Sequence, residues 1–382
     1  MKYPGILLAI LIAIPAITLS PAIYTAEQHG PATDVINKNT GEIESMTWFE
    51  TLTGFKEESP EQVRKNLVVE GDRLKSLVNG KSYICGTLTT PSLAELRQQV
   101  AAVASPTGRL KMLSIVGNVQ HMHKDPANAN AMFQVASQFN LLEMVGPQVT
   151  PERGVGIYEH DRTQGPACAI SAGAGTIYRN YFAPVNGKIG QTADNQIDCL
   201  ADLGATLGND NNRLWKMQNG YALPTRAALT EISERLQAAD EAERDRLRSL
   251  LRIGVHAQVE VTFDNAGHLV SQAYCSALPV AYSGISSRHW ESFARLVLEA
   301  SYEATFCAAV GNAQQTGSKR LFLTALGGGA FGNDKQWILD AIRRAAGLYR
   351  AYDLEVYIVS YGSADPAFLK LIEEFNRAQQ HD

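Results

Sequence analysis

Three successive glycines stand at the centre of the stretch with the clearest capacity for chemistry. Residues 323–334 read LTALGGGAFGND: an apolar run ends in glycines, then come an aromatic residue, another glycine and an Asn-Asp pair. Glycines let a backbone approach a phosphate closely, and the N-terminus of a following helix adds partial positive charge. The order indicates a strand whose end presents an anion to a helix. A tight strand-to-helix connection without a ligand would use the same residues.

The motifs around this run exclude several other chemistries. GGGAFGN lacks the Lys-Ser/Thr pair of a Walker loop. His160 has no nucleophilic Ser or Cys motif beside it, so we take it for a solvent-exposed bystander. His121 and His123 are two residues apart, and no other Cys or His pair stands at ligand spacing, which favours a polar loop over zinc. We expect no metal and no cofactor.

The elements that must position the glycine run alternate between strand and helix. Apolar runs predict strands at residues 320–326 and 354–360, and helical spacing follows each of them at 335–349 and 366–378. This order implies right-handed parallel crossovers and a sheet covered on both faces. The fold class is therefore predicted to be α/β, with three α/β/α layers.

The same patterns predict the remaining elements. The strands are 83–86, 112–116, 132–136 and 154–158, and 255–263 and 269–276 form a hairpin around Asp264-Asn265-Ala266-Gly267. The helices are 60–77, 91–103, 166–178, a surface pair in 226–251, and 289–310. The hairpin makes the predicted sheet a mixed one.

Ligands of such sheets lie outside the carboxyl ends of the strands. In this chain the predicted ends are Gly117-Asn118, residues 136–140, residues 327–333 and residues 361–363. They carry glycine, amide, hydroxyl and aromatic groups, with only scattered charge. This composition suits a nucleotide held by backbone amides.

Length and charge set the broad class of the protein. The chain has 382 residues, 45% hydrophobic and 19% charged, which is enough for one large domain with a smaller appendage. We divide it into an N-terminal extension at 27–108 that packs on the core, and a domain at 109–382 with an irregular insertion about 183–252. A formal net charge of −5 with both signs mixed argues against nucleic acid as a partner. We expect a monomer.

The N-terminus has the three-part form of a secretory signal. Lys2 precedes an almost wholly apolar stretch at 5–19 that Pro15 interrupts, and small residues follow at 20, 22 and 26. Residues 1–26 are thus predicted to be a signal or an N-terminal anchor, and the alternative is an apolar segment that is retained. A working signal would make the protein secreted or membrane-anchored, and otherwise it would be cytoplasmic. The five cysteines are odd in number and lack C-x-x-C spacing, so no disulfide framework is indicated.

Two loops together resemble those of the macrodomains, α/β/α modules that bind ADP-ribose. FQVASQFNLLEM looks like the strand end whose Asn holds the distal ribose, and LGGGAFGND matches the glycine loop that wraps the diphosphate. DRTQGPACAI joins them, and MTWFETLTGF and PSLAELR look like the N-terminal extension of one divergent branch. That branch includes bacterial effectors that remove ADP-ribose from arginine. The resemblance covers most of the chain from Met46 onward and implies a macrodomain-like mixed sheet with an N-terminal helical extension.

The resemblance implies a set of ligand-binding residues. Asn118 looks like the position that is an Asp contacting adenine in many macrodomains, and the change to Asn puts that contact in doubt. Tyr361 is placed to stack on the adenine, and Phe331 to cover the ribose. The full set of implied ligand-binding residues is Asn118, Val119, Gln134, Ser137, Asn140, Gln164, Gly327, Gly328, Gly329, Ala330, Phe331, Gly332, Asn333 and Tyr361.

Hydrolysis of an ADP-ribosyl link needs a carboxylate near the anomeric carbon of the distal ribose. Asp334 ends the glycine loop and Asp161 precedes a helix start, and we take both as candidate catalytic residues. The alternative for Asp334 is an N-cap of the helix that follows, and for Asp161 a surface turn. Glu143 comes three residues after Asn140, but helical spacing would direct it into packing. Arg179 is equally suited to a phosphate and to a buried ion pair.

The leading hypothesis is an ADP-ribosyl hydrolase that removes mono-ADP-ribose from modified protein, with arginine as a candidate linkage. Its expected partners are ADP-ribose and ADP-ribosylated protein, and a membrane only if the N-terminal segment is retained. One alternative is a module that binds ADP-ribose without cleaving anything, and another is a scaffold whose pocket has lost its ligand. Carboxylates at both loops favour catalysis, because a binding module needs neither.

Overall fold

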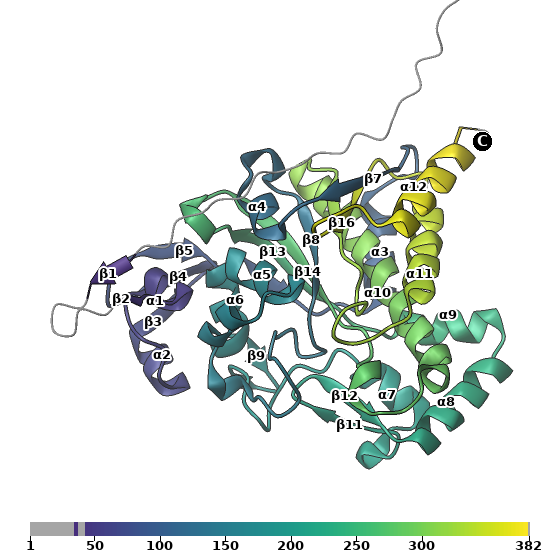
Figure 1. Ribbon diagram of the computed structural model, residues 1–382, viewed down its shortest axis with the longest axis horizontal. Coiled ribbons are helices and arrows are strands. Elements are labelled where there is room, and N and C mark those ends of the chain that lie inside the picture. The colour runs from purple at the N-terminus through teal and green to yellow at the C-terminus, as the bar shows by residue number, and fades with distance from the viewer. Residues whose placement is uncertain (1–33, 37–42, 381–382) are drawn as a thin grey trace, which may run out of the picture.

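A mixed sheet forms the centre of the computed structural model, which describes residues 34–36 and 43–380 (Figure 1). Within these residues seven strands follow the order β6-β13-β14-β8-β15-β16-β7. Strands β14, β8, β15, β16 and β7 are parallel, whereas β13 runs antiparallel to β14 and β6. Their bounds are β6 Thr87–Thr89, β7 Lys111–Val116, β8 Met132–Ala136, β13 Gly254–Glu260, β14 Leu269–Cys275, β15 Arg320–Leu323 and β16 Glu355–Ser360. The predicted mixed sheet and its hairpin are confirmed.

Helices cover both faces of this sheet, as Figure 1 shows. One layer contains α3 Leu93–Val103, α10 Ser287–Thr316, α11 Lys335–Leu348 and α12 Pro366–Ala378; the other contains α4 Val119–Lys124, α5 Gln164–Ser171 and α6 Gly173–Tyr181. Alanines such as Ala300 and Ala304 line α10, so neighbouring helices α3 and α11 approach it closely along its length. The α/β/α class expected from the sequence is confirmed.

The N-terminal extension is a small unit that packs beside α6. It consists of β1 Asp34–Ile36, β2 Ile43–Ser45, α1 Trp48–Thr53, α2 Pro60–Asn66, β3 Leu67–Glu70, β4 Arg73–Ser76 and β5 Ser82–Ile84. The predicted helix 60–77 was wrong beyond Asn66. Val68 and Val69 are β-branched, and Gly71 takes a left-handed φ of +63° at the turn, so the chain forms a hairpin.

Two features of the N-terminal region bear on the sequence analysis. The predicted signal or anchor at residues 1–26 lies outside the described residues. Among the helices that the structure describes, none has the length and apolar character needed to cross a membrane. Further along, β6 leaves the extension and pairs with β13 as an edge strand of the main sheet.

The insertion lies at the carboxyl side of the sheet and carries its own small elements. They are β9 Pro184–Val185, β10 Lys188–Ile189, α7 Ala201–Leu207, β11 Trp215–Gln218, β12 Tyr221–Pro224, α8 Arg226–Ala238 and α9 Glu241–Ser249. Helices α8 and α9 confirm the predicted surface pair. The β11–β12 hairpin was not anticipated, and its turn uses Asn219 and Gly220, both with positive φ.

Two predicted elements near the site take another form. Residues 154–158 were expected to be a strand, but Gly156–His160 is a 3-10 helix, η3. Gly154 begins this turn with a φ of +85°, which removes the chain from extended geometry. The predicted helix 166–178 is two helices, α5 and α6, because Ala172 has a ψ of 58° between them.

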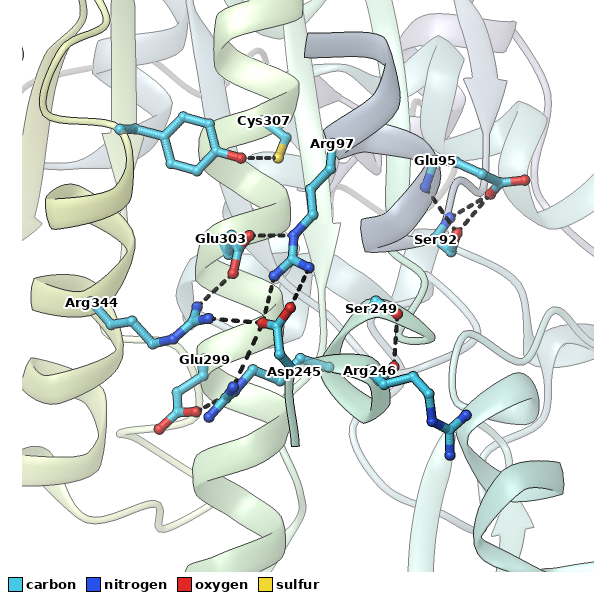
Figure 2. A network of polar contacts seen from close by, with 12 residues as sticks. Ser92, Glu95, Arg97, Asp245, Arg246, Ser249, Glu299, Glu303, Cys307 and Arg344 are labelled. Atoms are coloured by element: carbon cyan, nitrogen blue, oxygen red, sulfur yellow. Dashed lines mark hydrogen bonds and ion pairs between the residues drawn. The ribbon is translucent and has the colours of Figure 1, made fainter. Parts of the chain in front are cut away.

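An ion-pair network joins helix α9 of the insertion to α3, α10 and α11, which belong to one helical layer of the core (Figure 2). Arg97 on α3 forms two 2.8 Å bonds to Asp245 on α9 and a 2.6 Å bond to Glu303 on α10. Arg344 on α11 bonds to the same two carboxylates. Glu303 is 2% exposed, so its charge is compensated by arginines rather than by water.

Candidate functional site

Two adjoining cavities lie at the carboxyl ends of the parallel strands. The larger has a volume of about 930 Å³ and the smaller about 400 Å³. Asp161, Thr163, Gln164 and Thr324 line both, so the two cavities form one bipartite cleft. This is the edge at which the sequence predicts a ligand.

The larger cavity is bounded by the ends of β7 and β16. Asn118 and Val119 line it where β7 passes into α4, and Tyr361 lines it just after β16. Asn118 caps α4, since its Oδ1 accepts the backbone N–H of Gln120 at 2.8 Å. The Tyr361 side chain is 80% exposed, and an aromatic ring that open at a cleft is available to stack on a flat ligand.

The glycine loop forms one wall of the smaller cavity. Gly327, Gly329, Ala330 and Phe331 line it. Gly327 has a φ of +71°, and a Cβ there would lie 2.4 Å from the Ala277 Cβ, so only glycine fits. Among the described residues, no backbone acceptor takes the N–H groups of Gly329, Ala330 and Phe331. Adjacent free amides of this kind make a concave site for an anion.

The other two loop glycines and Asn333 shape the loop from behind. A Cβ at Gly328 would lie 3.0 Å from Ile338, and one at Gly332, whose φ is +70°, would lie 2.9 Å from Ala281. The Asn333 amide donates to the carbonyls of Leu278 at 2.8 Å and of Gly327 at 3.3 Å. None of these three residues lines either cavity, so they hold the loop rather than face the cleft.

An aromatic cluster closes the far side of the smaller cavity. The rings of Tyr221, Tyr282 and Phe331 lie 5.2–5.5 Å apart between centroids. Tyr221 comes from the β11–β12 hairpin, and its hydroxyl donates to the Met144 carbonyl at 2.7 Å. The insertion therefore contributes a wall of the site, which the sequence did not indicate, because Tyr221 and Tyr282 belong to no motif near the loops.

Glu143 is a buried carboxyl group that lines the smaller cavity. It is 3% exposed, and its Oε1 has no hydrogen-bond partner among the described residues. No helix follows Asn140, since Leu141 takes a φ of +65° and the chain continues as a loop. The helical spacing considered for Glu143 is absent, and the side chain faces the cleft. A Cβ on Gly165 would lie 2.2 Å from its Oε2, so glycine is needed beneath it.

The surroundings of Glu143 favour the protonated form of its carboxyl group. Burial raises the pKa of Glu143 well above its ordinary value of 4.5; the Arg179 charge opposes this and the Asp161 charge reinforces it. Asp161 is half-buried, and its Oδ1 accepts the Thr163 N–H at 2.8 Å. The site thus presents two carboxyl groups in different environments, an arrangement in which one can act as an acid and the other as a base.

Two amides expected to touch the ligand are engaged inside the protein. Gln134 donates to Thr305 at 3.0 Å and accepts the Thr324 N–H at 3.3 Å, on the α10 side of the sheet. Asn140 is fully buried, donates to Gln196 at 2.8 Å and accepts the Leu142 N–H at 3.1 Å. Neither amide lines the larger or the smaller cavity.

Gln164 and Ser137 do line the cleft, but they also hold the backbone that forms it. The Gln164 side-chain amide accepts the Ala136 N–H at 2.9 Å and donates to the Gln134 carbonyl at 2.8 Å. It thus pairs with the β8 backbone as the peptide groups of an adjacent strand would. The Ser137 hydroxyl donates to the Gln138 carbonyl at 3.1 Å. The amide of Gln164 is consequently occupied in this structure.

Asp334 and Arg179 lie away from the cleft surface. Asp334 is exposed, lines neither cavity and caps α11, with its Oδ1 accepting the Gln336 N–H at 2.7 Å. Its catalytic role stays a prediction. Arg179 is fully buried, donates to the Leu141 carbonyl at 3.1 Å and stacks 3.7 Å from the Tyr274 ring centre. It therefore holds the loop that carries Glu143.

Comparisons with known proteins give matches among solved structures alone. No protein-family model matches the chain, and no curated protein matches it. Poly(ADP-ribose) glycohydrolase from Thermomonospora curvata is 12% identical with a TM-score of 0.40, over 83% of this chain and 97% of that chain. Poly(ADP-ribose) glycohydrolase from Deinococcus radiodurans, in complex with ADP-ribose, is 14% identical with a TM-score of 0.38, over 76% and 94%. At this identity and TM-score the likeness says nothing about the activity of this chain.

Proposed function

We propose that the protein is an ADP-ribosyl hydrolase that removes mono-ADP-ribose from modified protein, with arginine as the linked residue. The observation that carries the proposal is Glu143, a buried carboxyl with an unpartnered oxygen that faces a cavity bounded by free backbone amides. Burying such a group without a partner costs free energy, so proteins keep one where a ligand or a reaction uses it.

The bipartite cleft suits the parts of ADP-ribose. The adenine fits the larger cavity, where Tyr361 offers its exposed ring and Asn118 lines the wall. The diphosphate fits the amides of Gly329, Ala330 and Phe331, which bind an anion without any basic side chain. The distal ribose then lies in the smaller cavity, beside Glu143 and Asp161.

The two carboxyl groups have complementary roles in this reaction. Glu143, protonated because burial raises its pKa, donates its proton to the leaving nitrogen as the glycosidic C–N bond breaks. Asp161 is the carboxylate that takes a proton from the attacking water, and it stabilises the oxocarbenium-like transition state. Water oxygen becomes bonded to the anomeric carbon, so the products are free ADP-ribose and the unmodified side chain.

Arginine is proposed as the linkage because of the sequence resemblance and because carboxyl groups recognise a guanidinium through paired hydrogen bonds. The test uses purified protein and a model protein that carries ADP-ribose on arginine, on glutamate or on serine, with poly(ADP-ribose) as a further substrate. We expect release of ADP-ribose from the arginine-linked substrate. Saturable ADP-ribose binding without release from any substrate would show a binding module instead. If the protein showed no binding and no release, both functions would be refuted.

A further inference from the structure

Glu57, in the N-terminal extension, hydrogen-bonds to a loop and a helix far away in the sequence. Its Oε1 accepts the Val155 N–H at 3.0 Å and the Tyr181 hydroxyl at 2.7 Å, and its Oε2 accepts the Gly156 N–H at 2.6 Å. Three donors therefore converge on one carboxylate from segments about a hundred residues later. Hydrogen bonds to an ionised acceptor are the stronger kind.

The loop that Glu57 holds is the one on which both catalytic carboxyl groups depend. Gly156 begins η3, and Tyr158 in its middle is 1% exposed. The Tyr158 hydroxyl accepts the Glu143 backbone N–H at 3.0 Å, and the Tyr158 carbonyl accepts the Asp161 N–H at 3.1 Å. One short helix thus fixes the backbone of Glu143 on one side and of Asp161 on the other.

The fit between Glu57 and this loop leaves little freedom. A Cβ on Gly154 would lie 2.4 Å from the Glu57 Oε2, and one on Gly156 would lie 2.8 Å from the same atom. The carboxylate therefore occupies the space that glycines leave open, and Gly154 has a φ of +85° that favours glycine. The contact therefore requires both the Glu57 carboxylate and the two glycines, Gly154 and Gly156.

We propose that Glu57 is a positioning residue for the reaction: through η3 it sets the Glu143 and Asp161 carboxyl groups relative to each other. Through Glu57, the N-terminal extension then helps to position the catalytic groups, although none of its described residues lines the cleft itself. The inference rests on the proposed hydrolase function. A displacement of about 1 Å in a catalytic group costs roughly 100-fold in rate, so a loosened η3 lowers kcat.

Two of the proposed ADP-ribose contacts, the glycine loop and the Tyr361 ring, are held independently of Glu57. The glycine loop follows β15 and Tyr361 follows β16, and in the described part of the chain neither shares a backbone hydrogen bond with η3. Loss of the Glu57 carboxylate is therefore expected to lower kcat more than it lowers the affinity for ADP-ribose. If Glu57 only stabilised the fold, its substitution would lower the melting temperature without lowering kcat more than ADP-ribose affinity.

The experiment compares wild type, Glu57→Gln, Glu57→Ala and the neighbouring exposed control Glu58→Ala, assayed below the melting temperature of each. We expect a fall in kcat of at least about tenfold for Glu57→Ala, a smaller fall for Glu57→Gln, which keeps one acceptor oxygen, and no change for Glu58→Ala. Hydrogen exchange of peptides covering 139–146 and 153–162 supplies a readout that needs no activity, and both peptides should exchange faster in Glu57→Ala.

The outcomes separate the two proposals. Wild-type protein that releases no ADP-ribose would refute the proposed function, whatever the variants do. Wild-type turnover that Glu57→Ala retains, with the exchange of both peptides unchanged, would overturn the positioning role alone. If Glu57→Ala does not fold, Tyr181→Phe and Glu57→Gln replace it, since the first removes one of the three contacts and the second weakens another. The test is then made on kcat and on the hydrogen exchange of the two peptides in these variants.

Discussion

Glu143 and Asp161 line the same small cavity, but one is buried and the other is half-exposed. Asp161 raises the pKa of Glu143 through its charge, and burial of Glu143 acts in the same direction with the larger effect. Glu143 therefore holds its proton at a pH where an ordinary carboxyl group has lost its own. The difference between the two groups comes from their surroundings, since their side-chain chemistry is nearly the same.

Glu143→Gln should abolish most of the turnover. Glutamine keeps the shape but cannot donate a carboxyl proton, and removal of a general acid costs roughly 100-fold or more in rate. Released ADP-ribose measured by chromatography gives kcat, and calorimetry gives ADP-ribose affinity, which should change little. Glu373→Gln on the exposed face of α12 is the matched control. Wild-type kcat in Glu143→Gln would remove Glu143 from the mechanism.

Asp161→Asn should lower kcat roughly 100-fold or more, because it removes the proposed general base, and should shift the alkaline limb of the remaining pH–rate profile to lower pH. The negative charge of Asp161 raises the pKa of Glu143, so its removal lets Glu143 lose its proton earlier as pH rises. Asparagine still accepts the Thr163 N–H, so the turn persists. The profile of kcat from about pH 5 to 10 measures this shift. An unmoved alkaline limb, with turnover still measurable, would show that Asp161 does not act on Glu143.

Glu143→Gln should also make the protein more stable at high pH. The folded state holds the Glu143 proton more tightly than the unfolded state, whose pKa is near 4.5. This contribution to stability is fully present below pH 4.5 and is lost as pH rises through the folded pKa. The variant avoids that loss, so its melting temperature should exceed that of wild type at alkaline pH and approach it in acid. A difference independent of pH would contradict a raised pKa.

Asp334→Ala should lower the unfolding free energy, while Asp334→Asn should not. Asp334 caps α11, removal of such a cap costs about 1 kcal/mol, and asparagine is as good a cap as aspartate. Urea unfolding measures both variants. We expect Asp334→Asn to keep turnover, since Asp334 lines neither cavity. Loss of turnover in a stable Asp334→Asn variant would instead give Asp334 the catalytic role considered from the sequence.

Tyr361→Ala should weaken ADP-ribose binding and leave stability unchanged. The side chain is 80% exposed, so its removal costs little in the fold. Stacking of a base on an aromatic ring contributes about 1–3 kcal/mol, so affinity should fall roughly 5- to 150-fold. Ribose 5-phosphate, which has no adenine, serves as the control ligand and should bind both proteins equally. Equal ADP-ribose affinity in both proteins would show that the adenine does not stack on Tyr361.

The elements around the site could be predicted from their apolar patterns. The helical spacing of α11 and α12 and the apolar runs of β15 and β16 extend over enough residues to be read directly. The carboxyl ends of those strands then locate the glycine loop and Tyr361. The prediction of a single helix at 60–77 failed because that stretch contains the short helix α2 and then a hairpin, whose turn at Gly71 has a positive φ.

The chemistry of the site was less visible in the sequence. Glu143 faces the cavity because Leu141 has a positive φ, a conformation rarely taken by a leucine and not encoded in any motif. Tyr221 and Tyr282 reach the cleft from segments far from either loop. Asn140 and Gln134 have the expected types at the expected positions, but tertiary contacts use their amides. Composition and spacing report which groups are present, whereas burial decides which of them face the ligand.

The ion-pair network of Arg97, Asp245, Glu303 and Arg344 has a consequence for motion. Helical faces lined by leucine and alanine can slide past one another by a turn at modest cost, but paired guanidinium and carboxylate groups fit in one register. The helices α3, α9, α10 and α11 should therefore move as one rigid body. Any opening or closing of the cleft around a ligand then falls to the opposite layer, α4 to α6, and to the loops at the strand ends.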